Sequence, residues 1–238
     1  MPGLRFMAVF AHPDDETSAV GGTLCRVIDE GGEALVVTAT RGEQGTLGTG
    51  GRRMSREDLP AVREAELREV LRSYGLTAPP VLLGYRDQEA RDADPAEVTA
   101  RVLDAMRAFK PDVVATFGPL GISRHDDHIA IHHTAREAFY AYAAEAQRET
   151  PPRLWYAAID MSVGGDIDGL ELDGPEASPN VYVDVADYWR KKSGALRLYR
   201  SQEDAQEFAA YLEANFFACE TFHQEHPALA EGSVTLGL

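Results

Sequence analysis

The sequence predicts an α/β fold: a Rossmann-like, mainly parallel sheet with helices on both faces. Two observations predict it. Short apolar runs alternate with longer amphipathic runs along the chain, and the apolar runs are nearly continuous, as in strands buried on both faces. The length of 238 residues suits one large domain. We therefore expect a single domain over residues 1–238, with a ligand site at the carboxyl ends of the strands.

The elements are expected in the following order. A first strand over 6–11 leads into a helical pattern that two glycines end at Gly31 and Gly32. The apolar, β-branched stretch 35–39 predicts a second strand, and the apolar positions spaced among the charges of 59–74 predict a helix that ends at Gly75. By the same criteria the remaining elements are a strand over 81–83, a helix over 96–109, a strand over 112–117, a helix over 129–146 and a strand over 154–159.

Two segments break this alternation. Residues 42–51 include five glycines and are expected to form a loop. The region near 161–180 is rich in Gly, Asp and Pro and lacks periodicity, which predicts a long irregular loop or hairpin. A C-terminal helical segment follows, in which Lys191 and Lys192 are expected on a solvated helix face.

The composition excludes some partners. The chain carries 39 acidic and 23 basic residues, a net charge of −16. Such a surface repels phosphate backbones and anionic lipid, so we expect no nucleic acid and no membrane insertion. The first apolar stretch is too short for a signal core or a membrane span, and only two cysteines occur, which favours the cytoplasm. The sequence leaves a homo-oligomer open.

Two polar clusters follow predicted strands. His12, Asp14 and Asp15 come after the first strand, and His125 to His128 come after the fourth. Imidazole and carboxylate groups from two strand ends are the ligands that a catalytic zinc ion takes, with a further position open for water. In each cluster two candidate ligands are three residues apart, which points them the same way on a helical turn. Helix capping by the carboxylates and solvated histidines are the alternative reading.

The motifs resemble those of the PIG-L/LmbE-like N-deacetylases, which act on N-acetylglucosaminyl-phosphatidylinositol and on precursors of mycothiol and bacillithiol. The resemblance covers residues 5–202. Its most specific parts are Ala-His-Pro-Asp-Asp-Glu after the first strand and the later His-x-Asp-His element. The remaining parts are Gly-Gly-Thr at 21–23, Thr-x-Gly-Glu-x-Gly at 40–45, Arg-x-x-Glu-Leu at 63–67, and a late Lys-x-x-Ala-Leu with Ser-Gln between 192 and 202.

The resemblance implies a set of roles. Three residues would bind zinc: His12, Asp15 and His128. Asp14 would be the general base, and His125 would stabilise the oxyanion or protonate the leaving amine. The remaining implied roles are orientation of a histidine by Asp127 and substrate contacts by Glu43 and Arg63.

The function implied is zinc-dependent removal of an N-acetyl group from an N-acetylglucosamine-type amino sugar, a small-molecule substrate. One rival is a zinc amidase that cleaves a larger amide, such as a thiol conjugate. The other is a nonenzymatic α/β ligand-binding module. The sequence departs from the family at Asp126, where proline is usual. This departure is expected to add a carboxylate near the metal and to remove a rigid φ, and it bears on the range of substrates more than on the metal.

Overall fold

The computed structural model describes residues 3–146, 148–160 and 172–238. The described strands form one eight-stranded sheet in the order β3-β2-β1-β4-β5-β7-β6-β8. The strands are β1 (Arg5–Phe10), β2 (Glu33–Thr38), β3 (Val81–Leu82), β4 (Val113–Thr116), β5 (Arg153–Ala158), β6 (Val181–Asp184), β7 (Cys219–His226) and β8 (Thr235–Leu236). The α-helices are α1 (Asp15–Asp29), α2 (Leu59–Tyr74), α3 (Pro95–Phe109), α4 (Gly121–Arg124), α5 (Asp126–Glu145), α7 (Trp189–Leu196) and α8 (Glu203–Ala214). Three 3₁₀ turns complete the set: η1 (Ala90–Asp92), η2 (Gly174–Ala177) and η3 (Ala186–Tyr188). The predicted α/β class is confirmed.

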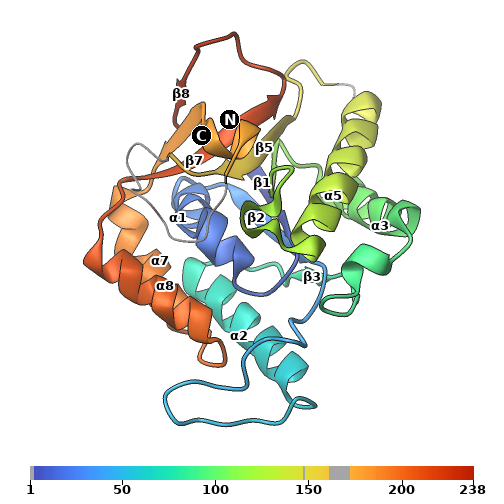
Figure 1. Cartoon of the computed structure of the whole chain (residues 1–238). Coiled ribbons are helices and arrows are strands. Elements are labelled where there is room, and N and C mark those ends of the chain that lie inside the picture. The colour runs from blue at the N-terminus through green and yellow to red at the C-terminus, as the bar shows by residue number, and fades with distance from the viewer. Residues whose placement is uncertain (1–2, 147, 161–171) are drawn as a thin grey trace.

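Five strands, β3, β2, β1, β4 and β5, are mutually parallel. Helices α1 and α2, with α7 and α8 beside them, cover one face, and α3 and α5 cover the other (Figure 1). Cover on both faces explains why the central strand β1 is almost wholly apolar: Phe6 to Phe10 have no exposed surface. The five predicted strands and four predicted helices lie close to observed ones.

The far edge of the sheet differs from the simple alternation. Strand β7 runs antiparallel to β5 and to β6. Its side chains alternate between buried and half-buried positions, and two of the buried ones are the polar residues Glu220 and Gln224. Because these buried positions carry polar side chains, β7 lacks the hydrophobic pattern by which a strand is detected in a sequence.

Glu220 explains one wrong prediction. Lys191 is exposed as expected, but Lys192 is buried, and its Nζ lies 2.7 Å from Glu220 Oε1. The same ammonium group donates to the carbonyl of Ser18 at 2.8 Å. Glu220 in turn accepts the backbone N–H groups of Gly22 and Thr23. A buried ion pair therefore ties α7 and β7 to the middle of α1.

The long loop predicted near 161–180 lies partly outside the described residues, since the description omits 161–171. The part from 172 onward contains the turn η2 and leads into β6. Within the described ranges, no helix has both the length and the apolar composition needed to cross a bilayer.

Candidate active site

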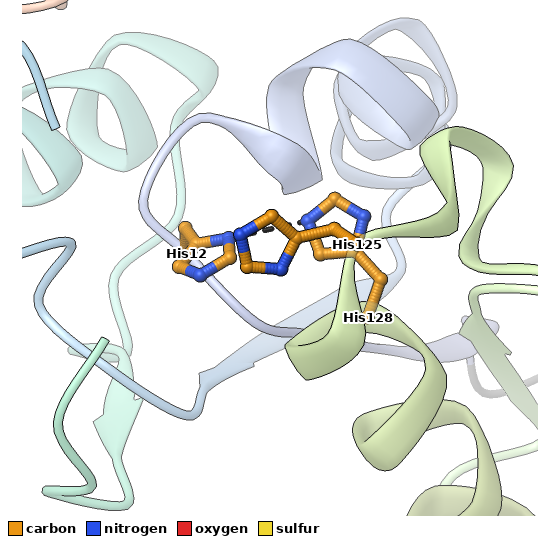
Figure 2. Close-up of side chains that lie close together, drawn as sticks. All are labelled: His12, His125 and His128. Carbon is orange, nitrogen blue, oxygen red and sulfur yellow. Dashed lines mark hydrogen bonds between the residues drawn. The ribbon is translucent and has the colours of Figure 1, made fainter. Parts of the chain in front are cut away.

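The two predicted polar clusters meet at the carboxyl edge of the parallel strands. His12 follows β1, Asp15 begins α1, and His128 lies in the first turn of α5, beyond β4. His12 Nδ1 lies 3.2 Å from His128 Nε2 and 3.4 Å from Asp15 Oδ2, and His128 Nε2 lies 3.5 Å from Asp15 Oδ1. Figure 2 shows the imidazole rings of His12, His125 and His128 grouped together. The structure thus brings the three predicted ligands into contact.

These three spacings fit a small metal ion. Atoms about 2.0–2.1 Å from the centre of a tetrahedron lie roughly 3.3–3.4 Å apart, which is the edge expected for zinc with nitrogen and oxygen ligands. The two histidine nitrogens lie 3.2 Å apart, and each lies 3.4 or 3.5 Å from a different oxygen of Asp15, which turns one oxygen toward each histidine. The same donor chemistry, two imidazoles and one carboxylate, is typical of catalytic zinc sites. The residues therefore fit the ion that the sequence predicts.

The other nitrogen of His12 faces two carboxylates. His12 Nε2 lies 3.1 Å from Asp87 Oδ1 and 3.4 Å from Asp127 Oδ2. Asp127 is fully buried and also accepts the backbone N–H groups of Gln88 and Arg91. This places Asp127 where the sequence analysis expects a residue that orients a histidine. A carboxylate on one ring nitrogen holds the proton there and leaves the other nitrogen to bind metal.

Asp87 occupies a place that sequence reasoning missed. It is buried, it is the closer of the two carboxylates to His12, and it also accepts the backbone N–H of Gln44 at 2.9 Å. Its position after β3 could have indicated that it lies near the site, because the ends of neighbouring parallel strands meet at one edge of the sheet. Without a histidine in its own segment, Asp87 gives no local motif.

The charged groups of the cluster shift one another's pKa values. Burial lowers the pKa of His12, but the facing carboxylates of Asp127, Asp15 and Asp87 outweigh it, so the pKa is raised well above its usual value. Burial lowers the pKa of His128, with Asp15 opposing the shift. Burial would raise the pKa of Asp15, but the two histidines hold it below its usual range. Asp15 is therefore an ionised carboxylate facing two imidazoles, an arrangement suited to a cation.

Asp14 is held apart from the ligand cluster. Its backbone has φ 104°, and its side chain makes no capping hydrogen bond to α1. Instead its Oδ2 accepts from Arg63 Nη2 at 2.8 Å, and the same nitrogen donates to the carbonyl of Pro13. Asp14 therefore occupies the N-cap position of α1, but the alternative reading, in which its carboxylate caps the helix, is wrong. Burial raises the pKa of Asp14 well above its usual value, with Arg63 opposing the shift.

Arg63 lies behind Asp14. It is buried, and its guanidinium also donates to the carbonyl of Gly42 at 3.1 Å. Through these contacts Arg63 supports the Asp14 carboxylate and the backbone around it. The predicted contact of Arg63 with substrate stays a prediction. Glu43 accepts the backbone N–H of Asp87 at 3.0 Å and lines a surface groove of about 610 Å³. The other lining residues are Gln44, Arg56, Glu57, Pro60, Gly84, Tyr85 and Arg86.

His125 is the N-cap of α5. Its Nδ1 accepts the backbone N–H of Asp127 at 3.2 Å. Its ring centroid lies 4.8 Å from those of His12 and His128. A nitrogen that accepts a hydrogen bond carries no proton, so in this arrangement the proton of His125 is on Nε2. His125 is thereby an N–H donor beside the ligand cluster.

Asp126 does not add to the cluster as expected. Its side chain is 58% exposed, and its carboxylate forms an ion pair with Arg91. The physical reason is its place in the first turn of α5, where it faces away from the buried Asp127. The departure from the family at this position therefore leaves the ligand set unchanged.

Comparisons with known proteins bear on this geometry. The sequence profile described as PIG-L, GlcNAc-PI de-N-acetylase, matches residues 7–139, which include both polar clusters. The chain belongs to the PIG-L family. A relative from Saccharopolyspora erythraea, named 1D-myo-inositol 2-acetamido-2-deoxy-alpha-D-glucopyranoside deacetylase 2, is 30% identical over 249 residues, covering 91% of each chain.

Two solved structures show that the fold is shared with other proteins. The conserved protein TT1542 from Thermus thermophilus has a TM-score of 0.70 and 26% identity, covering 95% of this chain and 97% of its own. GalB, the 4-carboxy-2-hydroxymuconate hydratase from Pseudomonas putida, has a TM-score of 0.73 and 20% identity, covering 96% and 98%. The second likeness concerns the fold alone. Because this PIG-L fold also occurs in a hydratase, the reaction has to be argued from the site.

Proposed function

We propose that this PIG-L protein is a zinc-dependent N-deacetylase that removes the acetyl group from an N-acetylglucosamine-type amino sugar in the cytoplasm. The observation that carries the proposal is the close grouping of His12, Asp15 and His128, in which the two imidazoles lie 3.2 Å apart and Asp15 turns one oxygen toward each of them. Beside it lies Asp14, a buried carboxylate that no capping bond engages. This is the pair of components that hydrolysis of an amide by water needs: a Lewis acid site and a base.

His12, Asp15 and His128 would hold the zinc ion, which when bound supplies Lewis acidity toward water and the amide carbonyl. Asp14 would accept a proton as water attacks the carbonyl carbon, and its raised pKa makes it a stronger base than an ordinary aspartate. Arg63 fixes the direction of that carboxylate through its 2.8 Å hydrogen bond.

The transferred proton and the charge of the oxyanion are then assigned to named groups. His125 would donate its Nε2–H to the oxyanion, since its Nδ1 is occupied by the N-cap hydrogen bond. Acting as a general acid instead would require a second proton on Nδ1 and loss of that cap. We therefore assign protonation of the leaving amine to Asp14, which would return the proton it took from water. The C–N bond breaks, the free amine leaves, and the acetic acid releases its proton to solvent as acetate.

Two findings support the choice of substrate. The relative from Saccharopolyspora erythraea is named for a deacetylase of an N-acetylglucosamine joined to inositol. The groove is connected to the proposed metal site through its lining residue Glu43, which accepts the backbone N–H of Asp87, and Asp87 faces His12. A volume of about 610 Å³ suits a second ring joined to the sugar. We therefore propose that the acetylated sugar lies at the metal site and its aglycone lies in the groove.

The test compares acetate release from three compounds at equal concentration: an N-acetylglucosamine glycoside with a ring aglycone, free N-acetylglucosamine and an N-acetylated amino acid. The proposal expects the highest kcat/KM for the glycoside. A larger rate on amides with bulky acyl groups would favour the amidase rival. Zinc binding without turnover of any amide would favour the ligand-binding module.

A further inference from the structure

A buried carboxylate beneath the loop after β4 takes no part in the proposed reaction. Glu176, in η2, has no exposed surface. Its Oε1 accepts the backbone N–H groups of Leu120 at 3.2 Å and of Ile122 at 3.1 Å. Its own carbonyl accepts the N–H of Ile159, just beyond β5, at 2.9 Å. Glu176 is therefore fixed to the sheet and holds the 120–122 loop through one carboxylate oxygen.

This loop overlaps the single-turn helix α4, and its backbone conformation is unfavourable and non-helical at Ile122. Gly121 has φ 65°, Ile122 has φ 62° and Arg124 has φ 57°. A positive φ is unfavourable for a residue with a side chain, and a β-branched residue rarely adopts it. Such residues persist where several contacts fix them. Successive N–H groups converging on one anion form such a fixing contact.

The strained loop contacts His128, one of the three proposed metal ligands. The carbonyl of Gly121 lies 2.9 Å from His128 Nδ1, and Ser123 Oγ lies 3.4 Å from the same nitrogen. A carbonyl can only accept, so Nδ1 of His128 carries the proton and Nε2 keeps its lone pair. Nε2 is the atom that faces His12 and Asp15. A Cβ at Gly121 would lie 2.7 Å from the His128 Cβ, so loop and ring fit closely.

We propose that Glu176 is a positioning residue for His128. It acts through the loop: its carboxylate holds the amides of Leu120 and Ile122, and the carbonyl of Gly121 then fixes the tautomer and direction of the imidazole. The inference rests on the proposed role of His128 as a zinc ligand. Gly118 belongs to the same arrangement, because a Cβ there would lie 2.3 Å from Glu176 Cγ.

The experiment measures zinc affinity and the His128 tautomer in the whole protein. We expect Glu176→Ala to weaken zinc binding by about 10- to 100-fold in chelator competition, the usual cost of losing a partner behind a metal ligand. In the metal-free variant, ¹⁵N NMR of His128 should show a mixture of tautomers where the unaltered protein shows a proton on Nδ1. Unchanged affinity and an unchanged tautomer in a folded Glu176→Ala protein overturn the inference.

If the alanine variant does not fold, Glu176→Asp is the variant used to test the inference. It keeps the charge but withdraws the carboxylate by one C–C bond, about 1.5 Å, so both amides cannot be held as before. We expect at least a threefold loss of zinc affinity, and an unchanged affinity overturns the inference.

The matched control is Asp112→Ala. Asp112 Oδ2 likewise accepts a backbone N–H, from Arg5, but at the opposite end of β4. It should lower the melting temperature without changing zinc affinity. Loss of affinity in Asp112→Ala equal to that in Glu176→Ala would mean a general loss of stability and contradict a positioning role.

His128→Ala separates the inference from the function beneath it. If His128→Ala abolishes tight zinc binding and Glu176→Ala changes nothing, only the positioning role fails. If His128→Ala itself retains the affinity, the ligand assignment of the proposed function fails.

Discussion

Replacing Asp14 with asparagine separates proton transfer from metal binding. Asparagine keeps the size of the side chain and an oxygen that can accept the 2.8 Å hydrogen bond from Arg63. It removes the basic lone pair that takes a proton from water. A positioned base is worth about 10²–10⁴-fold in rate, or about 2.7–5.5 kcal/mol in the barrier. The backbone should tolerate the change, since asparagine, like aspartate, adopts positive φ and Asp14 has φ 104°.

The assay pairs two measurements on the same Asp14→Asn preparation. Zinc content by mass spectrometry should stay near that of the unaltered protein, because the carboxylate of Asp14 is bound by Arg63 and is not one of the three proposed zinc ligands. Acetate release should show kcat lowered by about 10²–10⁴-fold with little change in KM. A zinc-loaded variant with full activity would refute the assignment of Asp14 as the base.

Three further predictions concern a proposed zinc ligand, a buried ion pair and a closely packed glycine. Asp15→Ala removes one of three ligands, so dialysed protein should contain much less zinc, and retention of a full equivalent would contradict the ligand set. Lys192→Ala leaves the buried Glu220 without its cation, which should cost about 3–5 kcal/mol in the free energy of unfolding measured with urea, whereas a loss below about 1 kcal/mol would show that the pair contributes little. Gly22→Ala places a Cβ 2.7 Å from that of Val185, and overpacking of this kind should lower stability by about 1–3 kcal/mol, a value that unchanged thermal unfolding would contradict.

The parallel half of the sheet could be predicted because its strands are buried on both faces. A strand such as β1 then appears as a continuous apolar run, and the helices between strands carry the 3.6-residue pattern. The antiparallel edge could not be predicted in this way. Strand β7 buries Glu220 and Gln224, and those groups are satisfied by partners far away in the sequence, such as Lys192 and Trp155. Distant partners of this kind leave no local pattern.

The same distinction applies to the site. His12 and His128 could be predicted as neighbours because each follows a parallel strand, and such strand ends meet at one edge. Asp14 could be read either as a base or as a helix cap, and only its backbone angle and its bond to Arg63 exclude the cap. Glu176 acts on the site through backbone amides of another segment, and a contact with main-chain groups requires no particular residue at the other end. Such contacts become visible only in the structure.

The most direct test of the central claim is the product balance on 1D-myo-inositol 2-acetamido-2-deoxy-α-D-glucopyranoside, the compound for which the Saccharopolyspora erythraea relative is named. Acetate and free amine are measured together for the purified protein, for protein treated with a chelator and for the treated protein given zinc. We predict equal amounts of both products from the first, almost none from the second, and recovery in the third. Undiminished product from the metal-free protein, or no acetate from this or any other N-acetyl sugar with zinc bound, would contradict a zinc-dependent amino-sugar deacetylase.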